Sequence, residues 1–387
     1  MNKYDVAVIG GGMVGAAVAL GFAEQGRRVV VIEGKAPTPY APQQAMDVRV
    51  SAISNHSVAL LESLGAWQTI QSMRACPYKR LETWEHPECR TRFHSDDVAC
   101  DQLGYIVENR IIQLGLWSQF SVWPNLALRC PVTVEHIEYG PMNQVTLSDG
   151  EVIEAGLIVG ADGAHSRVRQ SAGIGITAWD YRQHCMLINV KTERPQQDIT
   201  WQQFTPSGPR SFLPLCGHQG SLVWYDTPKR IRQLKAMTPL QLASEIKTHF
   251  PAELGGIEVI QSGSFPLTRR HAQRYYTPHC VLVGDAAHTI NPLAGQGVNL
   301  GFKDVEALLN VTRDHEEILL SHLAQYERRR RPDNLLMQTG MDLFYKGFSN
   351  DKVPLKWIRN AALKVAEHSG PIKHQVLRYA LGMDASL

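Results

Sequence analysis

The chain has 387 residues, a formal net charge of +2 and 44% hydrophobic residues, which is enough for two or three domains. The near balance of acidic and basic residues gives no overall basic field and argues against nucleic acid as a partner. The seven cysteines are spread widely without a CxxC pair, and no credible signal peptide precedes them, so we expect reduced thiols in the cytoplasm.

The chain begins with an uncharged run over residues 6–23, VAVIGGGMVGAAVALGFA. Its length would permit a membrane-spanning helix, and Lys3 with the small residues that follow imitates a secretory signal. Five glycines inside the run argue against both, because glycine breaks helices, and a second apolar stretch, RRVVVIE, follows Gly26. The pattern therefore predicts a strand, a glycine turn, a helix and a second strand, the beginning of a βαβ unit.

Three glycines of this run form the pattern GxGxxG. We expect Gly10 to make the tight turn, Gly12 to let the backbone approach a pyrophosphate, and Gly15 to allow close packing of helix on strand. Glu33 ends the second strand, where an acid can hydrogen-bond an adenosine ribose and would repel a 2′-phosphate. The nucleotide is therefore expected to be FAD or NAD rather than NADP.

The stretches after this unit mix helices with short strands. Ser54 and Gly65 bound a predicted amphipathic helix, and residues 111–120 have helical spacing. Residues 80–95 predict two short strands around a turn, and residues 132–163 predict a meander of strands.

Four strand-like pieces without intervening helices lie between Cys185 and Tyr225 and predict an antiparallel sheet. A helical stretch near residues 230–250 and one more strand close this region, and an α/β pattern resumes near His279. The order predicts a nucleotide domain assembled from separated stretches and interrupted by a sheet domain.

Two further glycine-rich stretches each follow a predicted strand, GADGAHSRVR at 160–169 and GDAAHTINPLAGQGVNLG at 284–301. Asp285, at a strand end, can accept hydrogen bonds from a polyol such as the ribityl chain of a flavin. The backbone of residues 295–299 begins a helix whose positive end would stabilise a reduced, anionic flavin. Ordinary strand-to-helix loops have the same pattern, so either stretch alone leaves both interpretations open.

In this order, the GxGxxG, DG and GD stretches resemble those of the class A flavoprotein aromatic hydroxylases, the group with the para-hydroxybenzoate hydroxylase fold. DVRVSAIS at 47–54, YIVENRIIQ at 105–113, TWQQFTPSGPRSFLPL at 200–215 and MDLFYKGFSN at 341–350 are similar, more narrowly, to the ubiquinone-biosynthesis hydroxylases. The resemblance covers essentially the whole chain. It implies an α/β fold in which a Rossmann-type FAD-binding domain carries an inserted antiparallel β-sheet substrate domain and a C-terminal helical tail.

This fold predicts a division of the chain into three parts. The expected parts are a discontinuous FAD-binding domain over 1–75, 101–178 and 272–335, a substrate-binding sheet domain over 76–100 and 179–271, and a C-terminal helical region over 336–387.

The resemblance also assigns cofactor contacts by motif position. It implies that the first turn and Glu33 hold the ADP half of FAD, that Arg49 and Gln113 contact the flavin side and the phosphates, and that the backbone of Val134 lies against adenine. It associates Asp162 with both FAD and the reduced nicotinamide. The expected cofactor-binding residues are Gly10, Gly11, Gly12, Met13, Val14, Gly15, Glu33, Arg49, Gln113, Val134, Asp162, Asp285, Pro292, Gly295, Gln296, Gly297, Val298 and Asn299.

The implied activity is that of an FAD-dependent aromatic ring monooxygenase. NAD(P)H would reduce the flavin, O2 would form a flavin hydroperoxide, and the distal oxygen would pass to the ring of a polyprenyl methoxy-methyl-benzoquinol. Because the cofactor carries the hard step, no catalytic side chain is assigned; His288 is a weak candidate beside a favoured structural role. No second GxGxxG exists for the electron donor, so we expect NAD(P)H to dock transiently.

Several patterns leave alternatives open. His86, Cys89, His94 and Cys100 match no common zinc spacing, so no metal is expected. Aromatic residues of the predicted sheet fit a quinol pocket and a sheet core equally well, namely Trp201, Phe204, Phe212 and Trp224.

Basic residues gather toward the C-terminus. The run Arg328–Arg331 before Pro332 favours a solvated helix end over contact with anionic lipid. Residues 352–381 carry six Lys or Arg against one Glu, a pattern that fits either a packing helix or a basic amphipathic helix on a membrane. The resemblance favours the membrane, so we expect a cytoplasmic protein with peripheral contact at the inner face.

Two rival functions remain at this level. One is a sister hydroxylase that acts on another ubiquinone intermediate or another aromatic compound. The other is a non-catalytic FAD-bearing subunit that holds partners of a biosynthetic complex together, which the intact GD stretch disfavours.

Overall fold

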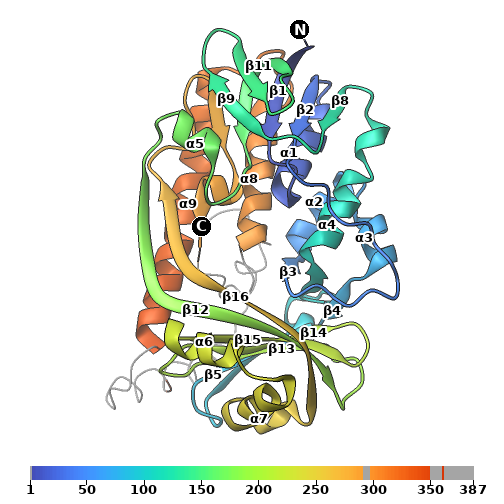
Figure 1. The fold of residues 1–387 in the computed structure, drawn as a ribbon, viewed down its shortest axis with the longest axis vertical. Helices are drawn as coiled ribbons and strands as arrows, with labels where there is room; N and C mark the ends of the chain where they lie inside the picture. The colour runs from blue at the N-terminus through green and yellow to red at the C-terminus, as the bar shows by residue number, and fades with distance from the viewer. Residues whose placement is uncertain (1, 291–296, 349–359, 361–387) are drawn as a thin grey trace.

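The computed structural model describes residues 2–290, 297–348 and 360. Pro292, Gly295 and Gln296 of the expected cofactor set lie outside the described residues, as does nearly all of the basic tail at 352–381. The described chain forms a mostly parallel sheet at one end of the molecule and a large antiparallel sheet at the other (Figure 1).

The mostly parallel sheet is built around β1, which pairs in parallel with β2 on one side and β11 on the other. Both faces of the central strands are buried, because helices cover them, and these strands are accordingly continuous apolar runs. In spatial order the strands are β8 (Leu126–Arg129), β2 (Val29–Ile32), β1 (Asn2–Ile9), β11 (Val152–Gly160), β10 (Asn143–Leu147) and β9 (Val134–Glu138), with β17 (Cys280–Leu282) also beside β11.

The antiparallel sheet contains two long strands that run from the parallel sheet to the far end of the molecule, β12 and β16 (Figure 1). Along β12 the side chains alternate between two apolar clusters. One cluster faces the interior between the sheets, and the other packs under α6 and α7. In spatial order the strands are β18 (His288–Thr289), β16 (Ile257–Ala272), β12 (Ile176–Thr192), β15 (Gln219–Asp226), β14 (Arg210–Leu215), β13 (Ile199–Gln203), β5 (Arg80–Trp84) and β6 (Arg90–His94).

A small antiparallel sheet lies between the two large ones. It consists of β3 (Val50–Ser54), β7 (Gly104–Glu108) and β4 (Cys76–Tyr78). β4 therefore pairs with β7, although the sequence division placed residue 76 at the start of the substrate sheet. The three-part division stays a prediction, and this strand shows that one of its boundaries falls inside a sheet.

The expected helices are present, with three differences: residues 67–73 form a helix that was not expected, the stretch near residues 230–250 forms two helices, and the C-terminal end differs. They are α1 (Met13–Glu24), α2 (Asn55–Ser63), α3 (Trp67–Met73), α4 (Asn109–Trp117), α5 (Arg167–Ser171), α6 (Pro228–Lys235), α7 (Pro239–His249), α8 (Gly297–Thr312) and α9 (Leu320–Phe348), with 3-10 turns η1 (Ser95–Val98), η2 (Phe120–Val122), η3 (Ala252–Leu254) and η4 (Gly284–Ala286). Ser54 caps α2 as predicted, because its side chain accepts from the backbone N–H of Ser57.

The predicted helix end at Pro332 is wrong. α9 continues through Pro332 to Phe348, so the expected boundary between residues 335 and 336 lies inside one helix. The arginine run is also not wholly solvated: Arg330 is buried and its Nε atom lies 2.8 Å from Asp304 Oδ1. None of the described helices is long and apolar enough to cross a membrane.

Candidate active site

The three glycine-rich stretches come together because the strands before them are neighbours. β1, β11 and β17 run in parallel, and the register aligns Ile9 with Gly160 and Gly160 with Leu282. Their carboxyl ends therefore meet at one edge of the sheet, which is where ligands bind in open α/β folds. The turns that follow are residues 10–12, 161–163 and 284–286.

The first turn has the backbone geometry that GxGxxG predicts. Gly10 has a φ of +100°, which a side chain would strain, and a Cβ on Gly15 would lie 1.9 Å from the carbonyl oxygen of Gly10. A Cβ on Gly12, in contrast, would meet nothing within 4 Å among the described atoms. Gly12 also begins α1, and no side chain of the described residues caps the first N–H groups of the helix.

Polar side chains from two other elements hold the first turn. One carboxylate oxygen of Glu33 accepts from Gly11 N–H at 2.7 Å, and the other accepts from Lys35 N–H at 2.9 Å. Gln113 and Trp117 of α4 both donate to the carbonyl oxygen of Gly11, at 2.8 and 2.7 Å. Gln113 thus supports the turn that faces the phosphates, and Glu33 keeps lone pairs free for a ribose hydroxyl.

The third turn places Asp285 at the end of β17. The Asp285 side chain is solvent-accessible, but protein groups surround it and remove part of its hydration. This partial desolvation raises the pKa of Asp285, although the nearby His288, Arg49 and Arg270 act to lower it. Gly284 has a φ of +57°, and a Cβ atom at this position would lie 3.2 Å from a methyl carbon of Val14 in α1. The third turn is therefore seated directly on the first.

A buried cluster fixes the third turn from behind. Asp304 of α8 is fully buried and accepts from Gly284 N–H at 3.0 Å, from Arg330 Nε at 2.8 Å and from Asn334 Nδ2 at 3.2 Å. Its second carboxylate oxygen also meets His288 Nε2. Burial would raise the pKa of Asp304, but His288 and Arg330 lower it to about 2, so the carboxylate stays charged.

His288, the weak catalytic candidate, belongs to this cluster. Its side chain is buried, its Nε2 atom meets Asp304, and it is not among the residues that line the cavity described below. Sequence analysis did not single out Asp304 or Arg330. The signal was present, because Asp304 lies between Leu300, Val305 and Leu308 on the buried face of a helix, where a charge needs a partner.

The second turn is held by Asp162 and Arg169. Asp162 Oδ2 accepts from the N–H groups of Arg167 and Val168, while its Oδ1 is buried without a partner among the described residues. The guanidinium of Arg169 donates to Ala164 O at 3.0 Å and to Ala286 O at 2.8 Å. Arg169 therefore ties the second turn to the third, a role that sequence analysis missed.

Two further expected cofactor residues make protein contacts instead of lining the cavity. The carbonyl oxygen of Val134 accepts a hydrogen bond from the Arg167 guanidinium. Asn299 is buried, donates to Ala52 O and accepts from Ser54 N–H and Ser57 Oγ, so it joins α8 to β3 and α2.

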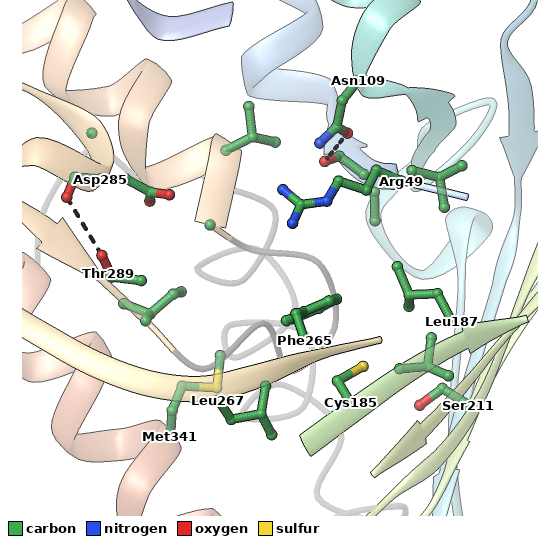
Figure 2. A pocket seen from close by; sticks show the side chains of 18 of the residues that line it. Arg49, Asn109, Cys185, Leu187, Ser211, Phe265, Leu267, Asp285, Thr289 and Met341 are labelled. Atoms are coloured by element: carbon green, nitrogen blue, oxygen red, sulfur yellow. Dashed lines mark hydrogen bonds between the residues drawn. The ribbon is translucent and has the colours of Figure 1, made fainter. Parts of the chain in front are cut away.

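A cavity of about 1140 Å³ opens in front of the turns and extends to the antiparallel sheet (Figure 2). One side, here called the turn wall, is formed by cavity-lining residues of the three turns and those next to them in the chain: Gly12, Met13, Val14, Ala161, Gly163, Ala164, His165, Val283, Gly284 and Asp285. The opposite side, here called the sheet wall, consists of Cys185, Leu187, Leu213, Val223, Tyr225, Phe265 and Leu267. The cavity thus joins backbone turns to an apolar surface.

Other expected residues border the same cavity. Gly297 and Val298 line it at the start of α8, and Arg49 extends toward Phe265, with its guanidinium carbon 5.5 Å from the ring centroid (Figure 2). Of the four sheet aromatics, Trp201 and Phe204 line the cavity. Phe212 and Trp224 are fully buried in the cluster under α6 and α7, so the two interpretations of this set each hold for part of it.

The described residues fit an FAD molecule. Gly12 leaves room at the uncapped N-terminus of α1 for a pyrophosphate, and the unpartnered Oδ1 of Asp162 lies in the neighbouring turn. Asp285 stands at the far end of the same edge, beside the helix start at Gly297. An extended dinucleotide with its pyrophosphate at α1 and its other end at Asp285 would lie along the turn wall, an arrangement that fits the class of flavin-dependent oxidoreductases.

The chain belongs to the FAD binding domain family, whose sequence profile matches residues 3–334. Its relatives confirm the expected kinship with ubiquinone-biosynthesis hydroxylases, and the protein is an FAD-dependent monooxygenase. It is 51% identical to the 3-demethoxyubiquinol 3-hydroxylase of Escherichia coli over 98% of both chains. It is 34% identical to the ubiquinone hydroxylase UbiL of Rhodospirillum rubrum, over 98% of this chain and 89% of that one.

Solved structures confirm the fold. The p-nitrophenol 4-monooxygenase PnpA of Pseudomonas putida matches with a TM-score of 0.79 at 19% identity, over 98% of this chain and 97% of that one. PqsL of Pseudomonas aeruginosa, a probable FAD-dependent monooxygenase, matches with a TM-score of 0.77 at 20% identity, over 94% and 99%. At such identities the likeness shows the shared architecture alone.

Proposed function

We propose that this protein hydroxylates the ring of a polyprenyl methoxy-methyl-benzoquinol in ubiquinone biosynthesis, with NAD(P)H as electron donor and O2 as oxygen source. The observation that carries the proposal is the apolar sheet wall directly opposite the turn wall in one cavity. A prenylated quinol needs such a surface, because its methyl groups and isoprenoid chain are apolar. The 51% identity to a 3-demethoxyubiquinol 3-hydroxylase over nearly the full length supports this substrate class.

The residues of the chain would bind, orient and shield. FAD, when bound, would supply electron transfer and the activation of O2. The N-terminus of α1 would hold its pyrophosphate, and Asp285 would accept hydrogen bonds from its hydroxyl groups. Leu187, Leu213 and Phe265 of the sheet wall would keep the quinol ring facing the turn wall and exclude water from the reacting side.

A direct test is incubation of the holoprotein with NAD(P)H, ¹⁸O2 and a short-chain demethoxyubiquinol, with product mass as the readout. The proposal predicts one added oxygen from ¹⁸O2 in the quinol. A matched reaction with an earlier ubiquinone intermediate should give little product. If that intermediate is hydroxylated instead, the sister-hydroxylase function is correct and the proposed substrate is wrong.

The same reaction tests the non-catalytic alternative. A hydroxylase should oxidise NAD(P)H faster when quinol is present, because substrate binding is coupled to turnover. An FAD-bearing subunit that only holds partners together should show a low rate that quinol leaves unchanged.

A membrane-bound substrate also suggests where the protein works. We propose a cytoplasmic protein in peripheral contact with the inner face of the membrane, on the basis of the six basic residues against one Glu between residues 352 and 381. Flotation with anionic vesicles should fall as salt is raised, and equal flotation with neutral vesicles would contradict the electrostatic contact.

A further inference from the structure

Two cysteines lie where the small sheet contacts the large antiparallel sheet. Cys76 belongs to β4 of the small sheet, and Cys216 directly follows β14 of the large antiparallel sheet. Both line one small void of about 10 Å³, together with Arg74 and Glu108. The two thiols face this void together, and each shifts the pKa of the other.

A single side chain holds the two positions together. The Nε2 atom of Gln196 donates to the Sγ atom of Cys76 at 2.8 Å. Its Oε1 atom accepts from the backbone N–H of Gly217, the residue after Cys216, at 2.5 Å. Gln196 therefore fixes the separation between β4 and the end of β14 at the point where the thiols face each other.

We propose that Cys76 and Cys216 form a peroxide-sensitive dithiol that closes reversibly to an internal disulfide. Hydrogen peroxide is the oxidant, and it is the by-product expected whenever O2 is reduced without transfer to substrate. This source of peroxide rests on the proposed function, whereas the reaction of the thiols with added peroxide does not.

The surroundings give the two thiols different roles. The neighbouring Cys76 thiol lowers the pKa of Cys216 to about 7, with further lowering from Arg74, against the opposing effects of burial and Glu108. The same contact, together with burial, raises the pKa of Cys76, which is 1% exposed. Cys216 is partly exposed, so it is the thiolate that peroxide can reach, and Cys76 is the thiol that keeps its proton.

The chemistry balances in two steps. The Cys216 thiolate attacks one peroxide oxygen, the O–O bond breaks, and hydroxide leaves to become water, which gives a sulfenic acid. The sulfur of Cys76 then attacks the sulfur of Cys216, the S–O bond breaks, and a second water leaves with the proton of Cys76. The two sulfurs lose two electrons in total, and the two peroxide oxygens gain them.

The disulfide would join two structures that border the cavity. In the small sheet, β4 pairs with β7 and β7 pairs with β3, whose residues Ser51 and Ala52 line the cavity. β14 supplies Ser211 and Leu213 from the large sheet. A covalent bond between β4 and the end of β14 would therefore hold these two sides of the cavity at a fixed separation.

The test treats the reduced holoprotein with a small excess of hydrogen peroxide in the absence of quinol. We expect free thiols to fall by two per chain, a cross-linked Cys76–Cys216 peptide pair in non-reducing mass spectrometry, and full recovery of thiols with dithiothreitol. Cys76→Ser should stop at a sulfenic acid on Cys216 that dimedone traps. Cys280→Ser, at a cysteine buried elsewhere, should still form the disulfide.

Two results would overturn the proposal. One is oxidation of Cys89, Cys100 or Cys130 before any Cys76–Cys216 pair forms, and the other is the loss of Cys216 to irreversible oxidation in the wild-type protein. The wild-type peptide map decides the matter even if the Cys76 variant does not fold. Because no quinol is present, failure here leaves the proposed hydroxylation untouched, and failure of hydroxylation leaves this result standing.

Discussion

The turn wall and the sheet wall face the same cavity but are built in different ways. The turn wall is supported mostly by backbone: directly behind it Gly10 and Gly15 approach other backbone atoms closely, and the buried cluster around Asp304 fixes the third turn. The sheet wall is made of side chains that alternate along strands, so most of its residues have a neighbour that faces the opposite cluster, as Leu187 has in Ile188.

This difference separates two kinds of consequence. A substitution in the turn wall acts on the shape of the backbone and hence on folding and cofactor binding. A substitution in the sheet wall changes one patch of apolar surface and hence the fit of a substrate. If a substitution in the sheet wall changed FAD binding, or one in the turn wall changed only the fit of the substrate, the two walls would be coupled.

The largest effect is expected for Gly15→Ala. The new Cβ would lie 1.9 Å from the carbonyl oxygen of Gly10 and 3.0 Å from the Cβ atom of Ala161, and neither atom is the end of a flexible side chain that could move aside. We expect a loss of more than about 4 kcal/mol in the free energy of unfolding, or no folded protein at all. Thermal unfolding and the flavin absorbance of the purified protein measure both consequences.

Gly12→Ala is the matched control at another glycine of the same motif. Its Cβ would meet nothing within 4 Å among the described atoms, so the protein alone should accept it with less than about 1 kcal/mol of change. FAD, however, is expected to approach this position closely. Normal unfolding with weakened FAD binding would agree with the proposed site, and unchanged FAD affinity would place the pyrophosphate elsewhere.

A smaller loss is expected for Asp304→Asn, behind the turn wall. The variant removes the charge that compensates buried Arg330, which should cost about 3 kcal/mol at neutral pH. It also weakens the acceptor of Gly284 N–H, so FAD affinity should fall with stability. Urea unfolding and flavin titration at pH 7 give the two values, and a stable variant with normal FAD affinity would contradict the supporting role.

The same carboxylate predicts a pH dependence. The pKa of Asp304 is lowered from 3.8 to about 2 in the folded protein, so the unfolded chain binds the proton more readily. Its contribution to stability is complete above about pH 4 and is lost as the pH falls toward about 2, by roughly 2 kcal/mol. Asp304→Asn should lack this part of the acid slope, and identical slopes in both proteins would be evidence against it.

The contrast between the walls also explains what sequence could predict. GxGxxG, DG and GD are contiguous, and each has a mechanical reason to contain glycine or aspartate at a strand end, so Gly10, Gly15 and Asp285 were found directly. The sheet wall comes from strands far apart in the chain, and period-two alternation alone does not say which face meets a cavity. This is why Phe204, which lines the cavity, was not separable from Phe212, which is buried under α6 and α7, before the fold was known.

Polar residues behind the turns were the other gap. Arg330 was grouped with a solvated run because Pro332 normally ends a helix, whereas α9 continues and packs Arg330 onto Asp304. Gln113 and Asn299 were expected to contact the cofactor, and the structure places them in protein hydrogen bonds that support the neighbouring turns. Tertiary pairing of this kind leaves little trace in local sequence.

The smallest effect is expected in the sheet wall, for Leu187→Ala. The side chain lies on the cavity side of β12 (Figure 2), and its removal should cost about 1.5 kcal/mol of apolar contact with a bound quinol. That corresponds to a roughly tenfold higher KM for the quinol, with the flavin content of the purified protein unchanged.

The neighbouring residue provides the control that makes this measurement decisive. Ile188 is fully buried on the opposite side of the same strand, in the cluster under α6 and α7. Ile188→Val should lower the free energy of unfolding by about 1 kcal/mol and leave KM unaltered. Adjacent positions would then separate stability from substrate fit along one strand. A KM increase in the Ile188 variant, or none in the Leu187 variant, would mean that the quinol does not rest on this face of β12.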